Sequence, residues 1–333
     1  MSKEKESRII RPFRFLSEWR SLPAYELISY IFMYASVPML AFGIKDYNFE
    51  ILKIILFSII CLYSGFFAAL IWNDITDSDI DSVAHPDRPI PSGKISSKKF
   101  FAIALIFSAS TFIFSILVSF WCFILVGFSA LFVAFHDKYL KKKVKIPAYS
   151  EIFTPIQWVV VAVFGYLAIW TALPQHSDII INMPVFENIS TKMYEITNMF
   201  IFVIFIYFAD NAHDLPEGIH DYDGDKKLGV RTYATSFGVR NAARISFFMF
   251  FLSGILGFLL FIRTTLTYIF LIPFVFIWIY TLYYSYKLLK IKDLNEMKKY
   301  GWTVGRKGFN YYLFAFDLVF VDLFVQLVFF NYL

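Results

Sequence analysis

A chain of 333 residues in which 58% of the side chains are hydrophobic and only 17% are charged cannot hide its apolar surface in one soluble core. Its mean hydropathy of +0.60 places much of that surface against lipid. The net charge of +5 comes mostly from Lys and Arg expected beside lipid headgroups. Charge and composition therefore indicate membrane lipids as partners and exclude nucleic acid.

Nine predominantly apolar runs of roughly 20 residues are each long enough to cross a hydrocarbon core of about 30 Å. In chain order they are 24–43, 51–72, 100–117, 119–136, 152–173, 197–213, 245–262, 265–286 and 309–331. The runs are continuous and do not alternate, and lipid offers no partner to an unpaired backbone group, so helices are predicted instead of strands. The predicted fold is all-α, a polytopic membrane bundle of nine transmembrane helices.

The third and fourth spans come from one uncharged stretch between Phe100 and Phe135. Because that stretch is far longer than one span needs, a tight turn is predicted near Ser115 to Ser119.

The distribution of basic residues orients the bundle. Nine spans place the N-terminus and the even-numbered connections on one side, and all but four of the 31 Lys and Arg fall there. The exceptions are Lys45, Lys53, Lys192 and Arg263. By the positive-inside rule this side is cytoplasmic. Residues 1–23 are a basic cytoplasmic segment without the apolar core of a signal peptide. We expect one integral membrane domain, 1–333, in the cell membrane.

Two smaller features lie outside the acidic motifs. Cys61 and Cys122 stand in apolar runs and are interpreted as small core residues, not as a disulfide or a metal site. The longest outer connection, about 174–196, contains a glycosylation sequon that begins at Asn188. The sequence does not decide whether this sequon is used.

A first acidic segment follows the second span. Asn73, Asp77 and Asp81 recur every four residues and Asp74 stands three residues before Asp77, so all four share one face if the helix continues. Like charges one turn apart repel, and more strongly where water is scarce, so a cation is expected to offset them. Carboxylate oxygens together with phosphate are the ligands that Mg²⁺ prefers. The segment therefore predicts a magnesium site.

A second acidic segment, 210–225, follows the sixth span on the same predicted side of the membrane. It holds two pairs with one-turn spacing, Asp210 with Asp214 and Asp221 with Asp225. Spacing alone does not choose between these pairs. One such segment would be interpreted as a solvated loop, but two at one face of a membrane protein indicate a shared site.

Other residues of the second segment limit its interpretation. Pro216 and Gly218 are expected to break the helix between the two pairs. An EF-hand is excluded because Gly224 comes too early and no glutamate closes the loop. His213 and His220 lie in the cluster, but a histidine metal site is not expected.

The residues that follow each cluster complete two motifs. The first cluster continues as Pro86-Asp87-Arg88-Pro89-Ile90-Pro91-Ser92-Gly93-Lys94-Ile95-Ser96, and the second as Lys226-Lys227-Leu228-Gly229-Val230-Arg231-Thr232. Together the motifs resemble the two signatures of the UbiA superfamily of intramembrane prenyltransferases. The resemblance implies a UbiA-type fold over the whole chain, with both motifs cytoplasmic. It also implies a Mg²⁺-dependent transferase of alkyl groups other than methyl, which binds a polyprenyl diphosphate donor between the motifs and alkylates a lipophilic acceptor.

The resemblance assigns roles to individual residues. The implied Mg²⁺ ligands are Asn73, Asp74, Asp77, Asp81, Asp221 and Asp225, of which the five aspartates are the expected catalytic residues and Asn73 also a substrate contact. This favours Asp221 and Asp225 over the earlier pair. Expected phosphate contacts are Arg88, Lys94, Lys141, Lys226 and Arg231. Where family members often have Tyr at the end of the fourth helix, this chain has His136 with Tyr139 nearby, and either supplies the polar contact.

The acceptor is less defined than the donor. The stretch 87–93 resembles archaeal geranylgeranylglyceryl-phosphate geranylgeranyltransferases and chlorophyll synthases, whereas 210–225 resembles the carotenoid-elongating branch. Geranylgeranyl transfer to a glycerophosphate ether lipid, a step in isoprenoid and lipid biosynthesis, is the prediction. Prenylation of a quinone or aromatic, a carotenoid or a tetrapyrrole is the alternative.

Two other classes of protein could carry acidic clusters in a membrane bundle. A cation-coupled transporter or channel would also use carboxylates, but such proteins place them near the bilayer midplane, and both clusters here are expected at one edge. A catalytically silent scaffold is disfavoured by the complete ligand sets in both motifs.

Overall fold

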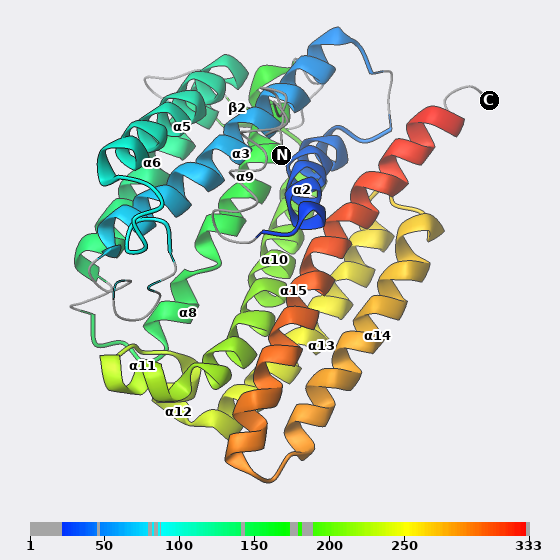
Figure 1. Cartoon of the computed structure of the whole chain (residues 1–333). Helices are drawn as coiled ribbons and strands as arrows, with labels where there is room; N and C mark the ends of the chain where they lie inside the picture. Colours follow the sequence, from blue (N-terminus) through cyan, green and yellow to red (C-terminus); the bar gives the residue numbers. More distant parts are fainter. Residues whose placement is uncertain are drawn as a thin grey trace, which may run out of the picture.

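The computed structural model describes residues 22–44, 47–78, 82, 86, 88–140, 144–173, 179–181 and 189–330. Within these ranges the chain forms a bundle of long helices (Figure 1). They are α2 (Ala24–Phe42), α3 (Phe49–Thr76), α5 (Ser97–Val118), α6 (Phe120–Phe135), α8 (Tyr149–Phe153), α9 (Ile156–Ala172), α10 (Met193–His220), α11 (Tyr222–Leu228), α12 (Tyr233–Phe237), α13 (Val239–Arg263), α14 (Tyr268–Lys290) and α15 (Leu294–Val325). The predicted all-α membrane fold is confirmed.

The membrane spans match the predicted runs. In the described part of the chain, 8 helical segments are long and apolar enough to cross a membrane, with α8 and α9 together forming one of them. The remaining predicted span is α6, a shorter apolar helix of 16 residues. The predicted turn before α6 is confirmed at Ser119, where extended backbone separates α5 from α6 and the Ser119 hydroxyl accepts a hydrogen bond from the Cys122 amide at 3.1 Å. Cys61 and Cys122 are buried and free, as predicted.

The helices form two packed groups. On the left of Figure 1, α3 packs against α5, and α5 is followed by α6. On the right, α13, α14 and α15 pack side by side, and α10 packs against both α13 and α15. The two groups meet along α2, α9 and α10, where large aromatic side chains such as Tyr34, Tyr166 and Phe202 are fully buried.

Glycines bring α15 close to α10. A Cβ at Gly301 would lie 2.5 Å from the Pro216 carbonyl oxygen, and a Cβ at Gly305 would collide with the Glu217 side chain. Small residues allow such close approach between helices in a membrane, where packing and not water drives association. The glycine spacing on α15 therefore positions the C-terminal half of α10.

Replacing Gly301 with Ala is expected to lower the free energy of unfolding by about 1–3 kcal/mol, because α15 must shift away from the α10 backbone. Gly127, in α6, is the matched control, since a Cβ there meets nothing within 4 Å. Gly127→Ala should be neutral or slightly stabilising. Both values are measurable by SDS titration of the detergent-solubilised protein followed by circular dichroism. Equal effects of the two substitutions would contradict close packing at Gly301.

The expected helix break at Pro216 and Gly218 is wrong. Helix α10 runs without interruption through both residues to His220. Proline removes the backbone donor that would bond the Ala212 carbonyl, and the Ser246 hydroxyl of α13 donates to that carbonyl instead, at 2.7 Å. Gly218 leaves room for the Glu151 carboxylate, which a Cβ would displace.

Three of the connections predicted to share a face, the fourth, sixth and eighth, contact one another. Ala148 donates to the Ser236 hydroxyl at 2.8 Å, which joins the fourth connection to the sixth. Lys298 at the start of α15 binds Asp223 at 2.8 Å, which joins the eighth connection to the sixth. At the opposite end Arg263 Nε donates to Asn198 at 3.1 Å.

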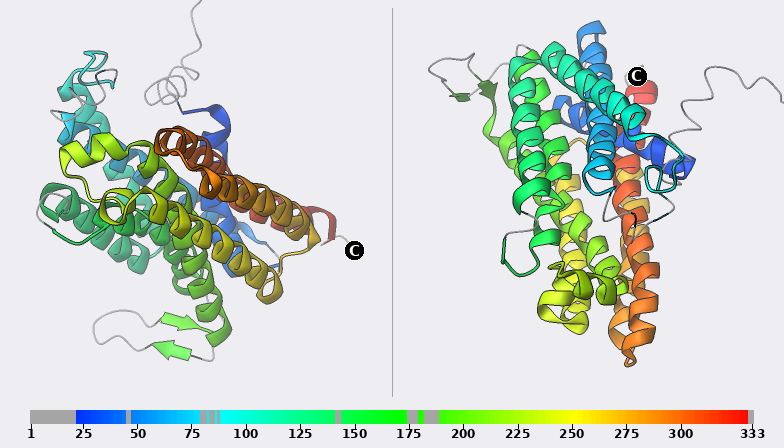
Figure 2. Two further views of the ribbon diagram at one scale, coloured as in Figure 1. Left: turned by 90° about the horizontal axis from the view of Figure 1, so that it is seen from below. Right: turned by 60° about the vertical axis from the view of Figure 1, so that its left-hand side comes forward.

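A small hairpin was not anticipated. In the longest outer connection, β1 (Ile179–Ile181) pairs antiparallel with β2 (Ile189–Thr191), and the hairpin projects from the bundle in both views of Figure 2. Glu195 anchors it by accepting hydrogen bonds from Thr191 at 3.0 Å and from the Trp170 indole at 2.8 Å. Asn188, with its sequon, lies outside the described residues.

Candidate active site

The first aspartate motif ends α3. Asn73 and Asp74 belong to its last turn, and Asp77 is the C-cap, whose amide donates to the Asn73 carbonyl at 2.9 Å. Asp74 is only 1% exposed. The helix therefore turns a carboxylate inward where the span ends. Asp81 lies outside the described residues, so its predicted place on this face stays a prediction.

A compact turn follows the first motif and returns a basic group to it. The amide of Ser92 donates to the Arg88 carbonyl at 2.9 Å, and Gly93 adopts φ 71°, a left-handed conformation that suits glycine. The turn leaves the Arg88 guanidinium 3.6 Å from the Asp74 carboxylate and Lys94 exposed. Arg88 thus lies at the motif, where it would also face a phosphate.

The second motif caps α10 and begins α11. The Asp221 amide donates to the Glu217 carbonyl at 3.0 Å, and the Asp225 amide donates to the Asp221 carbonyl at 3.0 Å. Asp221 and Asp225 are therefore one helical turn apart, as the spacing predicted. Burial, and then the charge of Asp221, raise the pKa of Asp225 to about 6. A bound cation would favour its charged form again.

Helices α3 and α10 run in the same direction. Both run downwards in Figure 1 and in the right-hand view of Figure 2, so the two motifs lie at ends that face the same way. Asn73, Asp74, Asp77, Asp221 and Asp225 supply oxygen ligands only. This donor set fits Mg²⁺, which takes carboxylates and substrate phosphates and keeps some of its waters.

Two basic residues that follow the second motif have protein contacts of their own. Lys226 donates to the Tyr222 hydroxyl at 3.3 Å and lies over its ring at 5.4 Å. The Arg231 guanidinium donates to the Lys145 carbonyl. Both are exposed or partly exposed at the face of the motif and remain candidate phosphate contacts. Lys141 lies outside the described residues.

His136 and Tyr139 differ in their surroundings. The His136 ring is partly buried and stacks on the Tyr149 ring of α8, with centroids 5.3 Å apart. Tyr139 is 42% exposed and packs against Phe135 of its own helix. His136 therefore contacts the neighbouring helix α8, and Tyr139 lies at the surface.

Comparison with known proteins agrees with this geometry. The model of the UbiA prenyltransferase family matches residues 31–305. This chain belongs to the UbiA prenyltransferase family. A digeranylgeranylglyceryl phosphate synthase from Saccharolobus solfataricus is 28% identical over 206 residues, which cover 62% of this chain and 64% of that relative. The match therefore spans just under two thirds of the relative's length.

Solved structures with this UbiA fold cover nearly all of the chain. One, from work on digeranylgeranylglyceryl phosphate synthase in membranes, has 20% identity and a TM-score of 0.60 and covers 94% of this chain and 99% of its own. Another, a UbiA homologue from Archaeoglobus fulgidus bound to GPP and Mg²⁺, has 15% identity and a TM-score of 0.52 and covers 90% and 99%.

The UbiA motifs are not the only acidic groups in the bundle. Asp210, His213, Asp214 and Glu217 occupy α10 one to three turns before Asp221 and face the interior, with Asp210 only 1% exposed. Glu151 of α8 is also buried, and the Tyr233 amide donates to its carboxylate. The expectation that Asp210 and Asp214 follow the sixth span is wrong, because α10 continues past them. The sequence signal for this was Asp210, which directly follows the apolar residues of the sixth span.

Proposed function

We propose that this UbiA-family protein is a Mg²⁺-dependent prenyltransferase that moves a geranylgeranyl group from its diphosphate to a glycerophosphate ether lipid. The observation that carries the proposal is the placement of two aspartate motifs where α3 and α10 end, at ends that face the same way. The name of the relative from Saccharolobus solfataricus supports the glycerophosphate acceptor.

The six motif residues would hold Mg²⁺ against the donor diphosphate. These are Asn73, Asp74, Asp77 and Asp81 from the first motif and Asp221 and Asp225 from the second. When bound, Mg²⁺ neutralises the charge that develops on the departing diphosphate oxygens. The binding of GPP and Mg²⁺ by the homologue from Archaeoglobus fulgidus supports this assignment.

Basic side chains would orient the diphosphate. Arg88 lies beside Asp74, and Lys226 and Arg231 follow Asp225 in the chain. Lys94 and Lys141 are the further candidates. Each cation would stabilise charge on the leaving group, which is where electrostatic stabilisation accelerates a reaction. His136 would add a polar contact from the fourth connection.

The bundle interior would receive the prenyl chain. The rings of Tyr30 and Trp158 stack with centroids 5.8 Å apart, and Tyr312 packs against Trp158 at 5.9 Å. These rings come from α2, α9 and α15, so they line the junction of the two helix groups. Aromatic faces attract a cation and exclude water, which would protect an allylic cation from hydrolysis.

The orientation is part of the proposal. The charge partition of the sequence, with all but four of the 31 Lys and Arg on one side, supports a cytoplasmic location for both motifs and the N-terminus. A family match over 31–305 supports one prenyltransferase domain, 1–333, which includes the basic N-terminal segment 1–23.

The test is prenyl transfer by the purified protein in detergent, with Mg²⁺ and geranylgeranyl diphosphate. Geranylgeranylglyceryl phosphate, 4-hydroxybenzoate, a quinone precursor, a carotenoid and a chlorophyllide would be offered in parallel. We expect product with geranylgeranylglyceryl phosphate and none when EDTA removes the metal. Product with another acceptor alone would replace the lipid assignment. If no acceptor reacts and no Mg²⁺-dependent donor binding is detected, the prenyltransferase proposal fails in favour of a transporter.

A further inference from the structure

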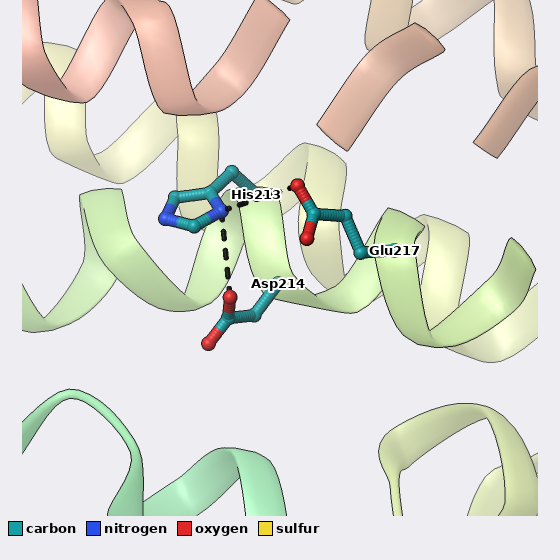
Figure 3. A group of neighbouring side chains, drawn as sticks. All are labelled: His213, Asp214 and Glu217. Atoms are coloured by element: carbon teal, nitrogen blue, oxygen red, sulfur yellow. Dashed lines mark ion pairs between the residues drawn. The ribbon is translucent and has the colours of Figure 1, made fainter. Parts of the chain in front are cut away.

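A second group of possible metal ligands lies deeper in α10 than the UbiA motif. His213, Asp214 and Glu217 each present one ligand atom, and these atoms all lie within 4.8 Å of one another. Figure 3 shows both carboxylates next to the same nitrogen of the His213 ring. His213 Nδ1 is 3.4 Å from Asp214 Oδ1 and 3.9 Å from Glu217 Oε1. The group begins two helical turns before Asp221.

A fourth residue orients the imidazole. His213 Nε2 and Asp210 Oδ1 are 3.1 Å apart, and Asp210 is 1% exposed. Because a carboxylate only accepts, Nε2 carries the hydrogen of this contact, and Nδ1 is the ring nitrogen that faces Asp214 and Glu217. Metal-bound histidines commonly donate their other nitrogen to a carboxylate in this way.

Within the described part of the chain, His213 Nδ1 lies near two carboxylates but makes no hydrogen bond. His213 is 6% exposed, and its Nδ1 is fully buried without a hydrogen bond among the described residues. A buried polar atom without a partner is costly, so the structure calls for a ligand there. The ring also packs against Phe309 with centroids 5.2 Å apart, which fixes its direction from the α15 side.

The spacing of the three atoms suits a small cation. Zinc bonds of about 2.0–2.2 Å in tetrahedral geometry place neighbouring ligand atoms about 3.4 Å apart. The distance from His213 Nδ1 to Asp214 Oδ1 has this value, at 3.4 Å, and the distance to Glu217 Oε1 is 3.9 Å. Both carboxylates are partly buried, with side chains 21% and 30% exposed.

The local charge also favours a cation. Asp210, Asp214 and Glu217 bring three carboxylates to one imidazole. The neighbouring Arg306 guanidinium is bound to the Glu26 carboxylate at 2.6 Å, so it is already paired. Buried carboxylates in a membrane bundle are costly unless a cation neutralises them. A divalent ion would reduce the excess negative charge more than a protonated imidazole does.

We propose that His213, Asp214 and Glu217 bind a divalent transition-metal ion of the zinc or manganese type, with Asp210 as the residue that positions His213. The imidazole ligand separates this site from the all-oxygen magnesium site, because nitrogen ligands select transition metals over Mg²⁺. The ion would cross-link side chains on successive turns of α10. It would also neutralise the carboxylates that precede the second aspartate motif in that helix. The proposal is independent of the acceptor, and of prenyl transfer itself.

The test is metal content, measured by plasma mass spectrometry on protein purified without chelator and dialysed against zinc chloride or manganese chloride. We expect about one tightly bound ion per chain, lost in His213→Ala and in Glu217→Gln. Asp210→Asn should keep the site but weaken its affinity about 10–100-fold. The control is the double variant Asp77→Asn with Asp221→Asn, which should retain the ion because the magnesium site is separate.

Thermal unfolding distinguishes loss of the metal site from misfolding of a variant. Zinc should raise the melting temperature of the native protein and of the double variant, but not that of His213→Ala or of the milder His213→Asn. No bound ion in the native protein after dialysis, or equal binding by the native protein and His213→Ala, would overturn the proposal. Loss of the ion in the double variant alone would place zinc at the magnesium site and overturn it equally. Each of these results is obtained without prenyl transfer, so they do not depend on the proposed function.

Discussion

Asp221→Asn should lower Mg²⁺-dependent prenyl transfer by about 10²–10³-fold, the usual effect of removing one group that stabilises transition-state charge. The substitution keeps the shape of the side chain and the amide that donates to the Glu217 carbonyl at 3.0 Å, so the end of α10 is preserved. What is lost is a negatively charged oxygen ligand. The measurement is kcat and KM for geranylgeranyl diphosphate at saturating acceptor, together with the Mg²⁺ concentration for half-maximal rate.

Asp223→Asn is the matched control. Asp223 lies two residues further along the same acidic segment, but it is exposed and its carboxylate binds Lys298 at 2.8 Å. Its side chain is not a predicted metal ligand, so the rate should stay within about twofold of the native rate, since an exposed ion pair contributes at most about 1 kcal/mol. Equal losses in both variants would show that the motif acts through its overall charge and not through specific ligands.

Asp322→Ala should lower the free energy of unfolding by about 3 kcal/mol or more. The Asp322 carboxylate is fully buried in α15 and caps the start of α14, where it accepts from the amides of Thr267 and Phe270 at 2.6 and 3.3 Å. It also accepts from the Thr267 hydroxyl at 2.8 Å and from Gln326 at 2.8 Å. Removing it leaves several buried donors without a partner, and each costs about 1–3 kcal/mol. Unfolding by SDS titration of the detergent-solubilised protein measures the loss.

Asp293→Ala is the control for that experiment. Asp293 is also an N-cap, since it accepts from the Glu296 amide at 2.8 Å, but it is exposed to solvent. Water can form the hydrogen bond that an exposed cap loses, so the free energy of unfolding should fall by about 1 kcal/mol or less. A loss as large as that of Asp322→Ala would mean that local capping, and not burial, accounts for the effect.

Local features of the sequence were enough to predict the membrane spans and to recognise the family motifs. Lipid requires a continuous apolar run for each helix, so the run that starts at residue 24 predicts α2. The uncharged stretch from 100 to 135 predicts two helices with a turn near Ser115 to Ser119, and the structure has it at Ser119. The same nine spans place nearly all Lys and Arg residues on one side of the membrane. The one-turn spacing of Asp221 and Asp225 is a local property, and the structure preserves it.

Contacts between helices determine the features that neighbouring residues in the sequence predicted wrongly or not at all. Proline normally ends a helix, but α10 continues through Pro216 because Ser246 of α13 satisfies the carbonyl that proline leaves free. That continuation carries Asp214 and Glu217 into the bundle beside His213, where the sequence predicted a helix break. Asp322 likewise caps a helix 55 residues away in the chain. Each of these features depends on a partner that is distant in sequence, so no window of neighbouring residues contains it.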